Sequence, residues 1–137
     1  MDPISFTASI IAILQLTSTV VGYLNDVKDA PKDRALCATE ASNLFNLLNL
    51  LKYRLEETDT DQTWYTAVRA LAVKDGAFDQ YKLALEQLQP KVTSGSGIRK
   101  VGNALLWKFT KQEVNVILSR MERLKTLIQI ALEMDQL

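Results

Sequence analysis

The chain has 137 residues, of which 47% are hydrophobic and 23% charged, which is the composition of one globular domain with a sizeable core. Sixteen basic residues balance sixteen acidic ones, and this argues against a nucleic-acid partner because dedicated nucleic-acid binders carry a clear basic excess. The sequence has no histidine, one cysteine and no Gly-rich phosphate loop, so a conventional catalytic or metal site has few groups to draw on. We therefore expect no enzymatic activity and no cofactor or metal.

The charges are distributed unevenly along the chain. Residues 1–60 hold eight acids and five bases, whereas residues 61–137 hold eight acids and eleven bases. The stretch 91–125 has eight bases against two acids. A basic surface is therefore possible in the C-terminal half, although a solvated helix face is the simpler interpretation of such charges.

The first expected helix begins at Pro3, with Asp2 as its N-cap, and ends before Pro31. Residues 4–25 include no charged side chain. Six positions follow one another at spacings of three and four residues, which is typical of a bundle seam. They are Ile10, Ile13, Thr17, Val20, Leu24 and Val27. A second apolar stripe beside the seam consists of Ile11, Leu14 and Val21. A helix with two apolar sides is either enclosed by neighbours or in contact with lipid.

Four interpretations of this uncharged helix differ in how well they fit its residues. A secretory signal is a poor fit, because no basic residue precedes the apolar stretch and no small-residue cleavage site follows it. A permanent membrane span is opposed by the eight Ser, Thr, Gln and Asn residues within 4–25. Two interpretations stay open: a structural core helix, or a segment that enters the membrane only under some conditions.

The next three helices are expected at 31–57, 62–74 and 77–88. The first has a seam of Cys37, Ala41, Leu44, Leu48, Leu51 and Leu55. The second aligns Trp64, Val68 and Leu71, and we expect it to stop before Gly76. The third aligns Phe78, Tyr81, Leu85 and Leu88 ahead of Pro90. Cys37 lies on a seam and is interpreted as a small packing residue rather than a reactive thiol.

A polar loop at 91–97 separates these helices from a short amphipathic stretch at 98–109. Four residues in this stretch are candidates for contact with lipid headgroups, because Trp beside Lys and Arg suits a membrane interface: Arg99, Lys100, Trp107 and Lys108. The alternative, which we favour, is that Trp107 and Phe109 plug the end of a bundle.

The last helix is expected over Lys111–Met134, after a capping box formed by Thr110 and Glu113. Its seam consists of Val114, Ile117, Met121, Leu124, Ile128 and Ala131. The sequence thus predicts an all-α fold: an antiparallel helical bundle of four main helices plus short connecting helices, in a single domain covering 1–137.

Five segments carry a family resemblance. "MDPIS", "ASIIAILQL" and "YLNDVKDAPKDR" near the start, with "WKFTKQEV" and "MERLKTLIQIALEMD" near the end, closely resemble the HeLo-like (SesA-type) N-terminal domains of fungal proteins. Such domains precede nucleotide-binding NACHT or other STAND modules, or belong to short proteins with an amyloid motif. The resemblance covers essentially the whole chain. It implies a bundle similar to those of HeLo incompatibility proteins and mixed-lineage kinase-like necroptosis executioners, at the N-terminus of a longer protein.

The resemblance also implies a function. The domain would induce cell death in fungal innate immunity or heterokaryon incompatibility, being cytoplasmic at rest and reaching the plasma membrane on activation. Its partners would be membrane lipids, further copies of itself, and an upstream nucleotide-binding receptor or amyloid-motif protein. The apolar contacts of the membrane-active helix would be Ile4, Phe6, Ile10, Ile11 and Leu14. Because the helix contains many Ser, Thr and Gln residues, an assembled pore is more plausible than a single spanning copy.

A second hypothesis treats the chain as a non-lytic helical module that oligomerises or passes on a signal through protein contacts. The bundle seams of the second and last helices are equally compatible with this role.

Overall fold

The computed structural model describes residues 3–26, 32–57, 63–89 and 108–134. In these ranges every regular element is a helix, and the helices pack together, so the prediction of an all-α fold is confirmed. The helices are α1 (Pro3–Asp26), α2 (Lys32–Glu57), α3 (Thr63–Ala70), α4 (Ala77–Leu88) and α6 (Lys111–Met134).

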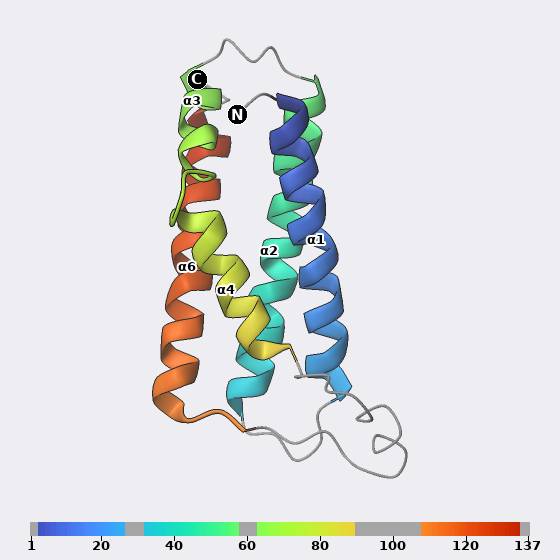
Figure 1. Cartoon of the computed structure of the whole chain (residues 1–137), viewed down its shortest axis with the longest axis vertical. Helices are drawn as coiled ribbons and strands as arrows, with labels where there is room; N and C mark the ends of the chain where they lie inside the picture. Colours follow the sequence, from blue (N-terminus) through green and yellow to red (C-terminus); the bar gives the residue numbers. More distant parts are fainter. Residues whose placement is uncertain (1–2, 27–31, 58–62, 90–107, 135–137) are drawn as a thin grey trace.

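Four of the helices surround one hydrophobic core. Helix α1 packs on α2 and α4, and α6 packs on the other sides of α2 and α4. Figure 1 shows that α1 and α4 run in one direction while α2 and α6 run in the other, so among these four helices each of α1 and α6 packs on one parallel and one antiparallel neighbour. The short helix α3 packs on α6. Of the expected amphipathic stretch 98–109, the structure describes residues 108 and 109, and residues 98–107 lie outside the described ranges.

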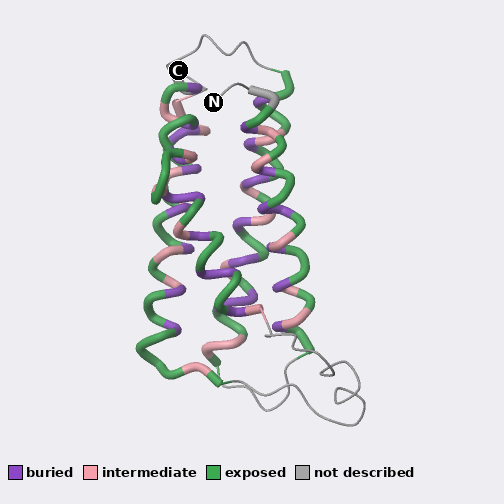
Figure 2. The backbone as a smooth tube through the Cα atoms, viewed as in Figure 1, coloured by how far each residue is buried: buried purple, intermediate pink, exposed green. Residues whose placement is uncertain are grey.

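The predicted seams of α2, α4 and α6 are the faces that the structure buries, as the inward side of the tube in Figure 2 shows. In α1 the seam is buried from Ile10 to Leu24, and Thr17 is buried with it. Val27 lies outside the described residues. The second stripe of α1 is divided, because Leu14 is buried whereas Ile11 remains 39% exposed. Of the two alternatives for a helix with two apolar sides, enclosure by neighbours does not extend to Ile11, because the described helices that cover α1 extensively are α2 and α4.

The third helix ends earlier than expected, at Ala70 rather than residue 74. The amide of Leu71 donates to the carbonyl of Val68 at 3.0 Å, a tightened turn that closes the helix. Gly76 is not a helix stop but the residue before α4, where its backbone is extended. A Cβ at this position would lie 2.8 Å from the carbonyl oxygen of Val73, so the close approach of the two backbone segments requires glycine. The side chain of Trp64 lies outside the described part; Val68 and Leu71 are buried as expected, and so is Tyr65.

The start of α6 is capped as the sequence predicts. The amide of Thr110 donates to Oε1 of Glu113 at 2.8 Å, and the amide of Glu113 donates to Oγ1 of Thr110 at 3.1 Å. The bond from the Thr110 amide, with a smaller contribution from its side chain, lowers the pKa of the Glu113 carboxyl. The capping box is therefore confirmed, and it fixes where the last helix begins.

One ion-pair cluster joins α2 to α6. Nζ of Lys125 lies 2.9 Å from Oε2 of Glu122 on its own helix and 3.0 Å from Oε2 of Glu40 on α2. These two carboxylates raise the pKa of Lys125. The cluster thus links the side chains of α2 and α6, two helices that run in the same direction (Figure 1).

Candidate functional site

Helix α1 is the candidate functional element. Its segment Ser5–Asp26 contains an 18-residue stretch with a mean hydropathy of 1.6, and α1 is the one described helix that is long and apolar enough to cross a membrane. Only a third of this segment is buried in the fold. By length and composition alone, a buried helix of a soluble protein meets the same criteria, so the surroundings of α1 decide how the helix is interpreted.

The predicted membrane-contact residues do not share one environment. Phe6, Ile10 and Leu14 are buried in the core, whereas Ile11 faces outward. The side chain of Ile4 lies outside the described part. Three of the five residues would therefore reach lipid only if α1 separated from its neighbours.

Phe6 anchors the N-terminal half of α1. Its ring lies 5.5 Å from that of Phe78 and 6.4 Å from that of Tyr65, centroid to centroid, in tilted arrangements. Phe6 is completely buried between these two rings and the rest of the core. Aromatic contacts of this kind add to the stabilisation from burial alone, so Phe6 is a strong contact between α1 and the α3–α4 region.

The outward face of α1 has no charged side chain before the end of the helix. Its exposed residues are small, polar or apolar: Ser5, Ala8, Ile11, Ala12, Gln15, Ser18, Thr19, Gly22 and Asn25. The first charge in the helix is Asp26, its last residue. The exposed faces of α2 and α6, in contrast, include several Lys, Arg and Glu residues. The lack of charge is therefore a property of both sides of α1.

A buried hydrogen bond joins α1 to α4. Oγ1 of Thr17 lies 2.9 Å from the hydroxyl oxygen of Tyr81, and both residues are completely buried. The single hydroxyl proton of Thr17 is donated to the carbonyl of Ile13 at 2.8 Å. Tyr81 must therefore donate to Thr17, and Thr17 accepts. Burial raises the pKa of the Tyr81 hydroxyl, so it remains protonated and able to donate.

The sequence placed Thr17 and Tyr81 on seams but did not pair them. A polar side chain on each of two apolar seams was the available signal, because buried hydroxyls need partners. Spacing along one helix shows which face is buried, not which residue of another helix lies opposite.

Several hydroxyls of α1 bond to the helix's own backbone. Oγ of Ser9 donates to the carbonyl of Ser5 at 3.1 Å, and Oγ1 of Thr19 donates to that of Gln15 at 3.1 Å. Thr17 makes the same i to i−4 bond within the core. Part of the polar character of α1 is thus satisfied inside the helix.

The candidate headgroup residues lie mainly outside the described part, which includes Lys108 but not Arg99, Lys100 or Trp107. Lys108 is exposed just before α6. Phe109 is half-buried and packs against the core, in agreement with the plug interpretation for this residue.

Cys37 is completely buried, and burial, with a smaller effect of Asp33, raises the pKa of its thiol to about 11. A protonated, buried thiol is a poor nucleophile, which agrees with its assignment as a packing residue. In the described ranges no group of three or more Cys, Asp or Glu side chains is placed to hold a metal ion.

Comparisons with known proteins give no relative: no family model, curated protein or solved structure matches this chain. A functional assignment therefore depends on α1, its contacts and its charge-free surface.

Proposed function

We propose that this chain is a HeLo-like, membrane-targeting domain that induces cell death in fungal innate immunity or heterokaryon incompatibility. In this proposal the resting protein is a cytoplasmic four-helix bundle. When copies are brought together by a nucleotide-binding receptor or an amyloid-motif partner, α1 leaves the bundle and enters the plasma membrane. No enzymatic activity is part of this proposal.

The observation that carries the proposal is the absence of charge on the exposed face of α1. A helix that only fills a core needs one apolar face, and its solvent face is free to carry Lys or Glu. In α1 the solvent face is uncharged from Ser5 to Asn25. Since a charge at the centre of a bilayer is costly, a surface without charges favours a helix that meets lipid on all sides.

The length of α1 supports the same proposal. At about 1.5 Å per residue, the 22 residues of Ser5–Asp26 extend over about 33 Å, close to the thickness of the hydrocarbon core. Because Ser, Thr and Gln lower the affinity of one copy for lipid, several copies are needed. Assembly multiplies weak individual affinities, and it allows polar side chains to face a water-filled lumen.

The test is to place a charge on α1 where the resting bundle tolerates it. Ile11→Asp and Gln15→Asp change exposed positions, so both variants should fold like the wild type by circular dichroism. We expect each to reduce leakage of dye from liposomes at least tenfold, because Asp opposes insertion. Val116→Asp on α6, at 45% exposure, is the matched control and should leak like the wild type.

Positions such as Ile10 and Leu14 are unsuitable for this test. Both are buried, so a carboxylate there would unfold the bundle and confound folding with insertion. Wild-type leakage that Ile11→Asp and Gln15→Asp leave unchanged would overturn the proposal.

A second candidate function is a non-lytic interaction module. It is favoured by the outer face of α2, where Leu36, Leu50 and Tyr53 are between 50% and 56% exposed. Apolar side chains at the surface are typical of protein contacts. A fluorescent fusion distinguishes the two functions: cell death without relocation to the plasma membrane supports the interaction module, and relocation before death supports membrane targeting.

A further inference from the structure

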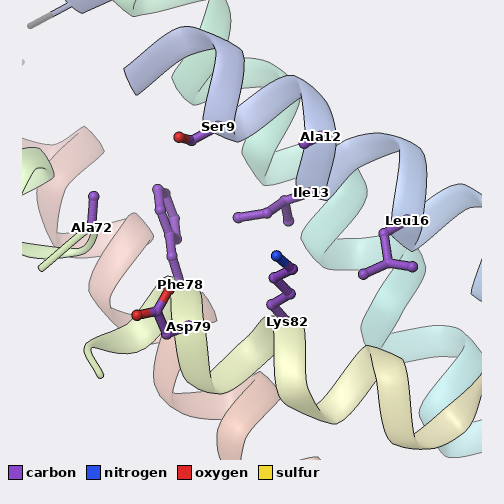
Figure 3. A pocket seen from close by; sticks show the side chains of 8 residues that line it. All are labelled: Ser9, Ala12, Ile13, Leu16, Ala72, Phe78, Asp79 and Lys82. Carbon is purple, nitrogen blue, oxygen red and sulfur yellow. The ribbon is translucent and has the colours of Figure 1, made fainter. Parts of the chain in front are cut away.

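A groove of about 200 Å³ lies between α1 and α4 (Figure 3). Its α1 wall is formed by Ala12, Ile13 and Leu16, together with the hydroxyl-bearing Ser9. The opposite side is formed by Ala72, Phe78, Asp79 and Lys82. The groove thus has largely apolar walls and one acidic and one basic side chain on α4.

The two charged side chains of the groove differ in their contacts. Oδ2 of Asp79 accepts a hydrogen bond from the amide of Asp75 at 2.9 Å, so this carboxylate is already engaged. In Figure 3 the Lys82 side chain extends from α4 towards Ile13 of α1, while Asp79 lies near Phe78. Lys82 forms no ion pair with any side chain that the structure describes. The groove therefore presents the ammonium group of Lys82, an exposed residue without an ion-pair partner among the described residues, beside an apolar surface and one helical turn from the Asp79 carboxylate.

The volume limits what the groove can accept. At about 200 Å³, the groove has room for a small ligand only. This volume is below the range of pockets for drug-sized ligands. One short alkyl chain fits, with its polar end at the ammonium of Lys82.

We propose that the α1–α4 groove binds a medium-chain fatty acid, with the carboxylate on Lys82 and the alkyl chain between Ile13 and Phe78. The ammonium supplies a charge-assisted hydrogen bond, and the apolar walls remove the chain from water. A fatty acid combines these two features in one small molecule.

Binding at this place has a defined effect on the fold. Both walls are needed, so the groove exists only while α1 packs on α4. A ligand that binds only this arrangement stabilises it by mass action. On the basis of the proposed function, the fatty acid would hold α1 in the bundle and slow its release, acting as a restraint and not as a trigger.

Octanoate is the probe, and binding is measured on the whole chain without vesicles, so the result does not depend on membrane activity. We expect 10 mM octanoate to raise the Tm by about 2–5 °C and to shift the methyl NMR signals of Ala12 and Ile13. Butyrate, whose chain is too short, and octyltrimethylammonium, whose charge is reversed, should do neither.

Two variants test the assigned contacts. Lys82→Glu should abolish the rise in Tm, whereas Lys111→Glu, the same change at an exposed lysine on α6, should retain it. Ala12→Phe, which fills the groove from the α1 side, should also abolish it. An equal rise in Lys82→Glu, or an equal effect of octyltrimethylammonium, would show non-specific adsorption and overturn the proposal.

The consequence for membranes is tested separately, with octanoate added before liposomes. Slower leakage in the wild type but not in Lys82→Glu supports the restraint. If octanoate binds as described but the wild type causes no leakage at all, the proposed function fails while the fatty-acid site stands.

Discussion

The buried bond between Thr17 and Tyr81 is directional. Thr17 donates to the Ile13 carbonyl and accepts from Tyr81, so the two hydroxyls depend on each other unequally. Without Tyr81 the threonine keeps a partner, and without Thr17 the tyrosine hydroxyl has none among the bonds described for it.

This inequality leads to a prediction for stability. Thr17→Val should lower the free energy of unfolding by about 1–3 kcal/mol, because it leaves a buried hydroxyl unpaired. Tyr81→Phe should cost only about 0.5–1.5 kcal/mol. Urea denaturation followed by circular dichroism measures both, and a larger loss for Tyr81→Phe would contradict the direction assigned to the bond.

The capping box gives a prediction for pH. Hydrogen bonds from Thr110 lower the pKa of the Glu113 carboxyl in the folded protein. The carboxylate therefore stabilises the fold at pH values above the carboxyl pKa of the unfolded chain, about 4.3. This stabilisation is lost as the pH falls through the lower carboxyl pKa of the folded protein. Glu113→Ala should therefore have a lower Tm than the wild type at pH 7, with the difference shrinking towards pH 2.

The control is Glu86→Ala, an exposed residue of α4 that forms no hydrogen bond with a described residue. Its Tm should follow that of the wild type across the whole pH series. A difference for Glu113→Ala that persists undiminished at pH 2 would show that the charge of the carboxylate is not what stabilises the cap.

At the scale of the element, α1 has a composition that its place in the bundle does not require. Gly22 is an example, since a Cβ added there meets no atom within 4 Å. A glycine within a helix is destabilising relative to alanine because of its conformational freedom in the unfolded chain. The resting fold thus has no packing reason for this residue.

Gly22→Ala should accordingly raise the free energy of unfolding by about 0.5–1 kcal/mol, as judged from urea denaturation. Gly76→Ala provides the opposite case, because its Cβ would meet the Val73 carbonyl oxygen at 2.8 Å. We expect this second variant to be less stable than the wild type. A loss of stability in Gly22→Ala would indicate a neighbour that α1 meets at that position.

At the scale of the whole molecule, the helices share one hydrophobic core. Removing α1 exposes Phe6, Ile10 and Leu24 together with the side chains that cover them. At about 1.5–3 kcal/mol for each large side chain, the cost approaches the total stability of a small domain. If α1 leaves the bundle as proposed, its release is therefore coupled to the stability of the entire bundle.

The coupling predicts that leakage follows stability, even for changes remote from α1. Leu124→Ala on α6 should cost about 2–5 kcal/mol and make liposome leakage faster, whereas Leu83→Ala, at an exposed position of α4, should change neither. Adding Ile11→Asp to Leu124→Ala should suppress the leakage again. Faster leakage that persists in this double variant would come from the unfolded chain rather than from inserted α1.

The sequence predicted the helices and their buried faces better than it predicted which residues of different helices contact each other. Spacings of three and four residues identified the buried side of α2 and α6, for example Leu44 and Met121, because periodicity is a property of one helix. The contact of Lys125 with Glu40 and the bond of Thr17 to Tyr81 join residues 85 and 64 positions apart, so no local pattern specifies them. The absence of charge that marks α1 was visible in the sequence, but the outward direction of Ile11 was not.

The hydroxyls of α1 have a consequence for transfer between solvents. In water, the hydroxyls of Ser9 and Thr19 could donate to water molecules equally well as to the carbonyls of Ser5 and Gln15. In hydrocarbon, the same internal bonds become the only ones available, and each removes most of the penalty of an unpaired hydroxyl. Ser9 and Thr19, with these bonds already formed, can exchange one medium for the other without rearranging their side chains.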